Sequence, residues 1–244
     1  MSPSTRPPAR EKGRRVLVVG ATGRLGVAIA KALAERGDEV AITARSRPRL
    51  ETLAEELAQL GPAPRTVVAD LRDRDAPEAI AKDLRLTGGL DDLVLACGPF
   101  PRTPLDELRR EDLEDTLTVH AIAPLLLVNA LADDLARRRG AVVALADAGV
   151  SRPYTNHVAY LTAKGALQTG LRALSVELAP QVRVNIVSLG IVADPEADAD
   201  PLRTHRLAAR SPLGRFGTAG EVVHAVLALL DATWATGEIW GIGR

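Results

Sequence analysis

Tyr160 and Lys164 stand four residues apart in the segment Tyr-Leu-Thr-Ala-Lys. On a helix, positions i and i+4 share one face, so we expect the lysine ammonium to reach the phenol and lower its pKa from about 10. Surface pairs also have this spacing. At the ligand-binding edge of a nucleotide-binding sheet, however, Tyr160 would act as the general acid of a reduction.

A glycine-rich segment, Gly-Ala-Thr-Gly-Arg-Leu-Gly at residues 20 to 26, follows the apolar run Val-Leu-Val-Val at 16 to 19. Glycine is needed where the backbone bends tightly or approaches a pyrophosphate bound to free N–H groups at a helix N-terminus. Helix caps and tight turns also use glycine, but the place directly after an apolar strand favours a dinucleotide site. The expected cofactor contacts are Gly20, Thr22, Gly23, Arg24, Leu25 and Gly26.

The second expected strand ends in Thr-Ala-Arg-Ser-Arg at residues 43 to 47. An acidic residue here would bind the 2′-hydroxyl of NAD, whereas arginine accommodates a 2′-phosphate. We therefore expect Arg45 and Ser46 to bind NADPH or NADP+, the alternative being that Arg45 and Arg47 belong to a solvated basic loop. Asp70 and Leu71 follow the third strand, where they either flank the adenine ring or, for Asp70, cap the next turn.

The elements that must position these residues alternate along the chain. This alternation predicts one α/β domain over residues 14 to 244, with a single Rossmann-type, doubly wound parallel sheet and helices on both faces. Residues 1 to 13 are expected to be a disordered tail, and 192 to 212 a mobile lid over the active site. The expected strands are 16–19, 39–43, 65–69, 90–96, 141–146, 182–187 and 238–242, and the expected helices are 25–36, 50–60, 77–86, 110–138, 155–178 and 219–230.

The composition of the chain limits the kinds of molecule that it is expected to bind. Lys plus Arg and Asp plus Glu both number 31, so no global field favours nucleic acid or an anionic membrane, and a small-molecule substrate is expected. The single cysteine, Cys97, cannot form an internal disulfide, and the histidines lack metal-ligand spacing, so no metal site is expected. No apolar run reaches the roughly 18 residues of a membrane span, and residues 1 to 13 lack a signal core. These features fit a cytoplasmic protein.

Nearly all of residues 14 to 242 resembles the short-chain dehydrogenase/reductase family. The resemblance rests on the glycine turn, on Asp-Leu at 70 and 71, on Tyr160 with Lys164, and on Val-Arg-Val-Asn at 182 to 185 followed by Gly190. Most members have a serine 13 residues before the tyrosine, where this chain has Asp147.

An aspartate at this position resembles the pteridine reductase branch. Two further features are similar to that branch: Arg24 stands where ordinary members have their middle glycine, and His-Ala-Ile-Ala-Pro at 120 to 124 resembles Asn-Ala-Ile-Ala-Pro. The resemblance implies that NADPH delivers hydride to a pterin-like ring while Asp147 and Tyr160 handle protons.

It further implies that Lys164 holds the nicotinamide ribose and that Phe100 sandwiches the substrate. The alternative for Phe100 is a core residue that anchors its loop. Arg24 either contacts a cofactor phosphate or an anionic substrate group, or is a surface charge of its helix. Further cofactor contacts are expected at Ala96, Gly98, Gly190 and Val192.

The chain also departs from the family pattern. Leu-Ala-Cys-Gly at 95 to 98 replaces Asn-Asn-Ala-Gly, Leu189 replaces a proline, and His120 replaces the usual helix asparagine. His120 either substitutes in proton transfer, since neutral imidazole donates and accepts, or is a buried structural residue.

Three functions therefore stand. The first is the NADPH-dependent reductase of a pterin-like heterocycle, and the second is a carbonyl (3-oxoacyl-type) reductase, which Asp147 disfavours because a carboxylate repels a developing oxyanion. The third is a catalytically eroded NADP(H)-binding protein, which the intact Tyr160 and Lys164 disfavour. Many small and apolar residues on the helices at 110–138 and 155–178 predict a homotetramer.

Overall fold

The computed structural model describes residues 13 to 193 and 201 to 243. The expected tail at 1 to 13, apart from Gly13, and residues 194 to 200 of the expected lid lie outside this part of the chain. Within it, seven strands form one sheet in the order β3-β2-β1-β4-β5-β6-β7, and every pair is parallel. The predicted doubly wound parallel sheet is confirmed. The strands are β1 (Arg15–Val19), β2 (Glu39–Ala44), β3 (Arg65–Val68), β4 (Asp92–Leu95), β5 (Ala141–Asp147), β6 (Arg183–Leu189) and β7 (Ile239–Ile242).

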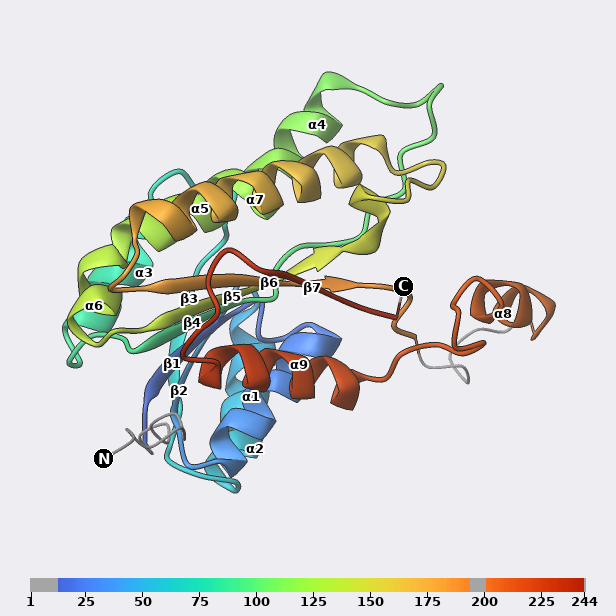
Figure 1. The fold of residues 1–244 in the computed structure, drawn as a ribbon. Helices are drawn as coiled ribbons and strands as arrows, with labels where there is room; N and C mark the ends of the chain where they lie inside the picture. The colour runs from blue at the N-terminus through green and yellow to red at the C-terminus, as the bar shows by residue number, and fades with distance from the viewer. Residues whose placement is uncertain (1–12, 194–200, 244) are drawn as a thin grey trace, which may run out of the picture.

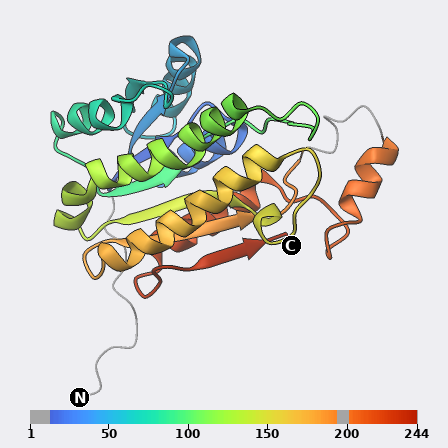
Figure 2. The ribbon, with the colours of Figure 1, turned by 90° about the horizontal axis from the view of Figure 1, so that it is seen from above.

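Helices cover both faces of the sheet (Figure 1). One face carries α1 (Arg24–Glu35), α2 (Arg47–Ala58) and α9 (Ala219–Asp231). The other carries α3 (Ala76–Arg85), α7 (Val158–Glu177) and the segments between 110 and 137, which cross the sheet beside α7 (Figure 2). Because side chains alternate across a strand, Leu17 packs into one layer and Val16 into the other, and both are fully buried.

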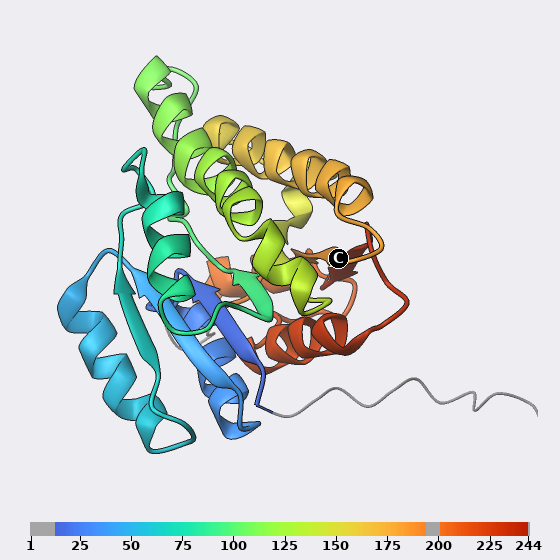
Figure 3. The same cartoon turned by 90° about the vertical axis from the view of Figure 1, so that its left-hand side faces the viewer.

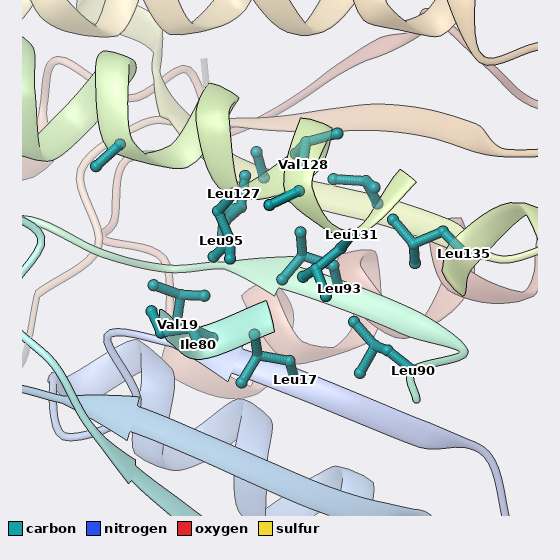
Figure 4. Packing of buried hydrophobic residues seen from close by; sticks show 14 of the residues in the cluster. Leu17, Val19, Ile80, Leu90, Leu93, Leu95, Leu127, Val128, Leu131 and Leu135 are labelled. Carbon is teal, nitrogen blue, oxygen red and sulfur yellow. The ribbon is translucent and has the colours of Figure 1, made fainter. Parts of the chain in front are cut away.

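The layer under α5 (Ala123–Ala130) shows how the sheet is held in place. Leu127 from α5 and Leu131 beyond it point toward Leu93 of β4, and Ile80 of α3 packs beside Leu17 (Figure 4). All five side chains are completely buried. Burying each such side chain contributes about 1.5 to 3 kcal/mol, so the strands that carry the site residues are firmly anchored.

The expected single helix over 110–138 is interrupted, and in this respect the prediction was wrong. It comprises α4 (Arg110–Leu117), a π-helical turn (Thr118–Ile122), α5 and α6 (Ala132–Arg137). The cause is Pro124, which has no N–H to give to the carbonyl of His120; the N–H of Ala123 instead bonds the carbonyl of Thr118, five residues back. This turn places His120 at the carboxyl end of the sheet.

The strand order reverses between β1 and β4: β2 and β3 lie on one side of β1, and β4 and the later strands lie on the other side (Figure 3). Open α/β sheets bind ligands in the crevice outside the carboxyl ends of the strands at such a point. The segment expected to be a lid contains a helix that the sequence did not predict, α8 (Pro201–Ala208), which lies beyond the carboxyl end of the sheet (Figure 1). In the described part of the chain, no helix combines the length and apolarity needed to span a membrane.

Candidate active site

The glycine turn lies at the point where β1 and β4 run side by side. Gly20 has φ +76°, and a Cβ added to it would lie 2.6 Å from the Cα of Cys97 and 2.8 Å from the carbonyl oxygen of Ala96. A Cβ on Gly26 would lie 2.3 Å from the carbonyl oxygen of Gly20. Only glycine therefore allows α1 to start so close to the end of β4.

The N-terminus of α1 is open to an anion. Gly23 is its N-cap and has no side chain to occupy the free N–H groups, and the first turn holds no acidic residue. The N–H groups of the first helical residues, which include Leu25, have no partner within the helix. This arrangement fits the pyrophosphate of a dinucleotide, and the contact of residues 20 to 26 with it stays a prediction.

The carboxyl end of β2 carries a cluster of positive charge. Ser46 is the N-cap of α2 without making a side-chain cap, and the first turn of α2 has no acidic residue. Arg45 and Arg47 are exposed beside it, and Arg49 donates from Nη2 to the carbonyl oxygen of Thr22, linking α2 to the glycine turn. Guanidinium groups around a helix N-terminus suit the 2′-phosphate of NADPH.

The residues after β3 are placed differently from an open ligand contact. Oδ1 of Asp70 accepts a hydrogen bond from the N–H of Arg72 at 3.0 Å. Asp70 therefore caps the turn after β3, which is the second of the two roles that the sequence allowed. Leu71 is buried in the hydrophobic core. A contact of either residue with adenine stays a prediction.

Arg24 joins the glycine turn to the segment after β6. Its Nη2 donates to the carbonyl oxygen of Val192, and Val192 forms an isolated β-bridge with Gly217. Gly190 lies against the end of β7, where an added Cβ would be 1.9 Å from the carbonyl oxygen of Gly243. Arg24, Gly190 and Val192 thus lie along the same edge of the sheet, and the proposed contact of Arg24 with a phosphate would require this hydrogen bond to open.

The three expected catalytic residues come together at the carboxyl end of β5. Asp147 ends β5, and Tyr160 and Lys164 project from α7. The hydroxyl of Tyr160 donates to Oδ2 of Asp147 at 3.1 Å, and the N–H of Gly149 donates to Oδ1 at 2.7 Å. The tyrosine proton is therefore directed at a carboxylate.

The expectation that Lys164 lowers the pKa of Tyr160 was wrong. Nζ of Lys164 donates to the carbonyl oxygen of Leu145 at 2.9 Å and lies 5.8 Å from the centre of the Tyr160 ring. Burial raises the pKa of Tyr160 above its ordinary value, and the Asp147 carboxylate raises it further. Tyr160 therefore holds its proton at neutral pH, as a proton donor must. Burial also lowers the pKa of Lys164.

Phe100 lies over this group and is not a core residue. Its side chain is 59% exposed. Its ring stacks on His157 with centroids 4.4 Å apart, and meets Tyr160 edge-on with centroids at 4.8 Å. A flat ring can stack here beside the proton donor.

Tyr154 and His157 were not predicted as site residues. The ring centroids of Tyr154 and His157 are 5.1 Å apart, and a Cβ on Gly149 would lie 2.3 Å from Cε1 of Tyr154. Burial raises the pKa of Tyr154, and so does the nearby Asp147 carboxylate. One signal was present in the sequence: the chain has two tyrosines, and they stand six residues apart.

His120 is buried in the π-helical turn behind the site, with 1% of its surface exposed. Its Nε2 lies 2.8 Å from the carbonyl oxygen of Pro99, which only accepts, so Nε2 carries the hydrogen and donates. Nδ1 has no partner among the described residues. Burial is the largest cause that lowers the pKa of His120 to about 3, and the positive charge of Lys164 is the second. A Cβ on Gly98 would lie 2.0 Å from the ring, so His120 also fixes the loop after β4.

The single cysteine, Cys97, lies beside the glycine turn. Burial raises the pKa of Cys97, which keeps it a thiol. In the described part of the chain, no group of three or more His, Cys, Asp or Glu side chains is arranged to hold a metal ion.

Known proteins share this sequence and fold. A family model described as "Enoyl-(Acyl carrier protein) reductase" matches residues 20 to 242. L-xylulose reductase of Bos taurus is 34% identical over 228 residues, which cover 91% of each chain. A solved structure of NAD+-bound xylitol dehydrogenase is 25% identical and has a TM-score of 0.88, over 96% of this chain and 99% of that one. L-sorbose reductase from Gluconobacter frateurii, solved with NADPH and L-sorbose, has a TM-score of 0.88 at 22% identity over 95% of each chain, which shows a common fold.

Proposed function

Because this chain belongs to the short-chain dehydrogenase/reductase family, we propose that it uses NADPH to reduce a carbon–nitrogen double bond in a flat, pterin-like heterocycle. The observation that carries the proposal is the hydrogen bond from the Tyr160 hydroxyl to the Asp147 carboxylate. A carbonyl substrate develops negative charge on its oxygen, next to which a carboxylate is unfavourable. A ring nitrogen that gains a proton has the opposite requirement, which Asp147 meets.

The cofactor supplies a hydride, and the donor set of the chain favours the phosphorylated form. The exposed Arg45 and Arg47 flank the open N-terminus of α2, and no acidic residue stands directly after β2 or in the first turn of α2 to bind a 2′-hydroxyl. Structural neighbours include NADPH-bound and NAD+-bound enzymes, so the choice rests on these side chains. Lys164, held by the carbonyl of Leu145, would bind the nicotinamide ribose with its remaining hydrogens.

Proton delivery follows from the described contacts. Tyr160 keeps its proton at neutral pH, and Asp147 holds the hydroxyl in one direction. The substrate nitrogen takes this proton in place of Asp147, and the adjacent carbon then takes the hydride, so one proton and one hydride add across the double bond. Phe100, exposed above Tyr160, supplies the surface on which the flat ring stacks.

A second candidate is the reduction of a sugar-like or 3-oxoacyl carbonyl. The 34% identity with L-xylulose reductase favours it. In this reaction Tyr160 would protonate the carbonyl oxygen. Tyr154, whose hydroxyl lies near Asp147, would provide the second hydrogen bond.

The proposed assembly is a homotetramer formed through α4, α5 and α7. Three apolar side chains at the outer surface of this layer support it: Ile122, Leu126 and Val158 are 49%, 48% and 43% exposed. Sedimentation that shows a monomer would exclude this assembly.

Oxidation of NADPH, followed by absorbance, tests the function. Dihydrobiopterin, dihydrofolate and L-xylulose are offered in parallel to the wild type and to Tyr160→Phe. The proposal expects turnover of a pterin that is lost in Tyr160→Phe. Turnover of L-xylulose alone would replace it with the carbonyl reductase, and NADPH binding without turnover of any of the three would favour a binding protein.

A further inference from the structure

The ring-bearing residues of this chain are concentrated at one place. The chain has two tyrosines, two phenylalanines, two tryptophans and four histidines. Both tyrosines and one phenylalanine lie together with His157 around Asp147; we call Phe100, Tyr154, His157 and Tyr160 the aromatic cluster. Its ring centroids lie 4.4 to 6.2 Å apart in four contacts.

The aromatic cluster is partly exposed to solvent and is held in place by hydrogen-bonded loops. Phe100 is 59% exposed although it contacts three other rings. Its loop is tied to the loop before α7, because the N–H of Thr103 donates to the carbonyl of Asn156 at 2.7 Å. Asn156 has φ +66°, a left-handed conformation that asparagine tolerates. Two loops therefore keep an apolar ring face in contact with solvent.

The charged group beside the aromatic cluster is the Asp147 carboxylate. Asp147 accepts the hydroxyl of Tyr160 and the N–H of Gly149, which fix the direction of its carboxylate. Among the residues that the structure describes, neither a lysine nor an arginine forms an ion pair with Asp147; the nearby Lys164 is buried and donates to Leu145. The carboxylate thus has hydrogen-bond donors and no salt-bridge partner among the described residues, while the buried Lys164 interacts with it electrostatically from behind the site.

Aromatic faces next to a carboxylate attract cations. The negative face of an aromatic ring attracts a cation within about 6 Å of its centre, and sites for quaternary ammonium ligands use several rings together. We propose that this site binds its substrate as a cation, with a protonated or quaternary nitrogen of a flat ring placed between the aromatic cluster and the Asp147 carboxylate. The inference rests on the proposed function for the place of the substrate and adds its charge. Protonation of the ring nitrogen by Tyr160 creates such a cation in the site, and this cation becomes a neutral amine when its carbon accepts the hydride.

Binding of two flat probes tests this inference without turnover. N-methylquinolinium carries a fixed positive charge, and 4-methylquinoline, neutral at about pH 8, has nearly the same size and shape. Each is titrated calorimetrically into the full-length protein saturated with NADPH. We expect the cation to bind about tenfold more tightly, which corresponds to about 1.4 kcal/mol.

Variants assign the preference to residues. Asp147→Asn keeps the shape of the side chain and is expected to reduce the preference to about threefold or less, and Phe100→Leu to weaken binding of the cation more than that of the neutral probe. Asp83→Asn removes the same charge from the exposed ion pair with Arg65, outside the site, and is the matched control expected to keep the preference. Retained NADPH binding shows that each variant is folded.

The outcomes separate this inference from the proposed function. Equal binding of the two probes by the wild type, or a preference that survives in Asp147→Asn, would overturn the cation site even if pterins are reduced. A preference lost in Asp147→Asn and kept in Asp83→Asn supports the cation site even if no pterin is turned over.

Discussion

Replacing His120 by asparagine should remove a specific loss of stability in acid. The folded protein lowers the pKa of His120 to about 3 from an ordinary value of 6.5. Below 6.5 the unfolded chain therefore binds a proton that the folded protein does not bind. Stability from this group is complete above pH 6.5 and is lost as the pH falls toward 3. Burial of the ring is the largest cause, and the positive charge of Lys164 is the second.

The size of the effect follows from the two pKa values. At about pH 5.5, one unit below the unfolded pKa, the folded state stays neutral while the unfolded state is mostly protonated, which costs about 1.4 kcal/mol of stability relative to about pH 7.5. Asparagine does not titrate, and its amide can still donate to the carbonyl of Pro99. His120→Asn should therefore lack this part of the pH dependence whatever its stability at neutral pH.

Urea unfolding of both proteins at the two pH values measures the difference. Every other ionisable group is present in both proteins, so the contributions of these groups cancel in the comparison. We expect the wild type to lose about 1.4 kcal/mol more than His120→Asn between pH 7.5 and 5.5. The same loss in both proteins would show that His120 is not held neutral and would refute the reasoning.

Three further changes test the cofactor and proton sites. Tyr160→Phe should lower kcat about 100-fold or more because it removes the proton donor, while the dissociation constant of NADPH, measured by fluorescence, stays within about threefold of the wild type. Arg45→Ala should weaken NADPH about tenfold and NADH little in the same titration; equal weakening of both would disprove a contact with the 2′-phosphate. Gly20→Ala should lower the free energy of unfolding by more than Gly37→Ala, which should cost about 1 to 2 kcal/mol. Both glycines have positive φ, but a Cβ on Gly20 meets Cys97 at 2.6 Å and one on Gly37 meets nothing within 4 Å. Equal losses in urea would show that the close approach to Cys97 is unimportant.

The sequence predicted the sheet because its signals are local. Each buried strand is a short apolar run, and the glycine turn follows the first of them directly, so both could be found from neighbouring residues. The meeting of Asp147 with Tyr160 also followed, because β5 and α7 are consecutive elements. Bounds of elements were less well predicted: the helix expected from 155 begins at Val158.

The errors concern interactions that spacing does not reveal. The i, i+4 rule placed Lys164 and Tyr160 on one face of α7, but the ammonium found the carbonyl of Leu145, and the carboxylate of Asp147 came closer to the phenol. The π-helical turn arises from one missing N–H at Pro124, which the interpretation of 110–138 as a single helix did not take into account. Phe100 and His157 meet because two loops far apart in the chain are bonded to each other, which no local pattern shows.

The most direct test of the account is the ratio of kcat/KM for dihydrobiopterin to that for L-xylulose, measured with NADPH in the wild type and in Asp147→Ser. The central claim is that Asp147 and Tyr160 together serve a nitrogen that gains a proton and disfavour a carbonyl. It predicts a ratio above one in the wild type that falls at least about tenfold in Asp147→Ser, because serine donates a hydrogen bond where the carboxylate repels. A wild type that prefers L-xylulose, with a ratio unchanged by Asp147→Ser, would contradict it.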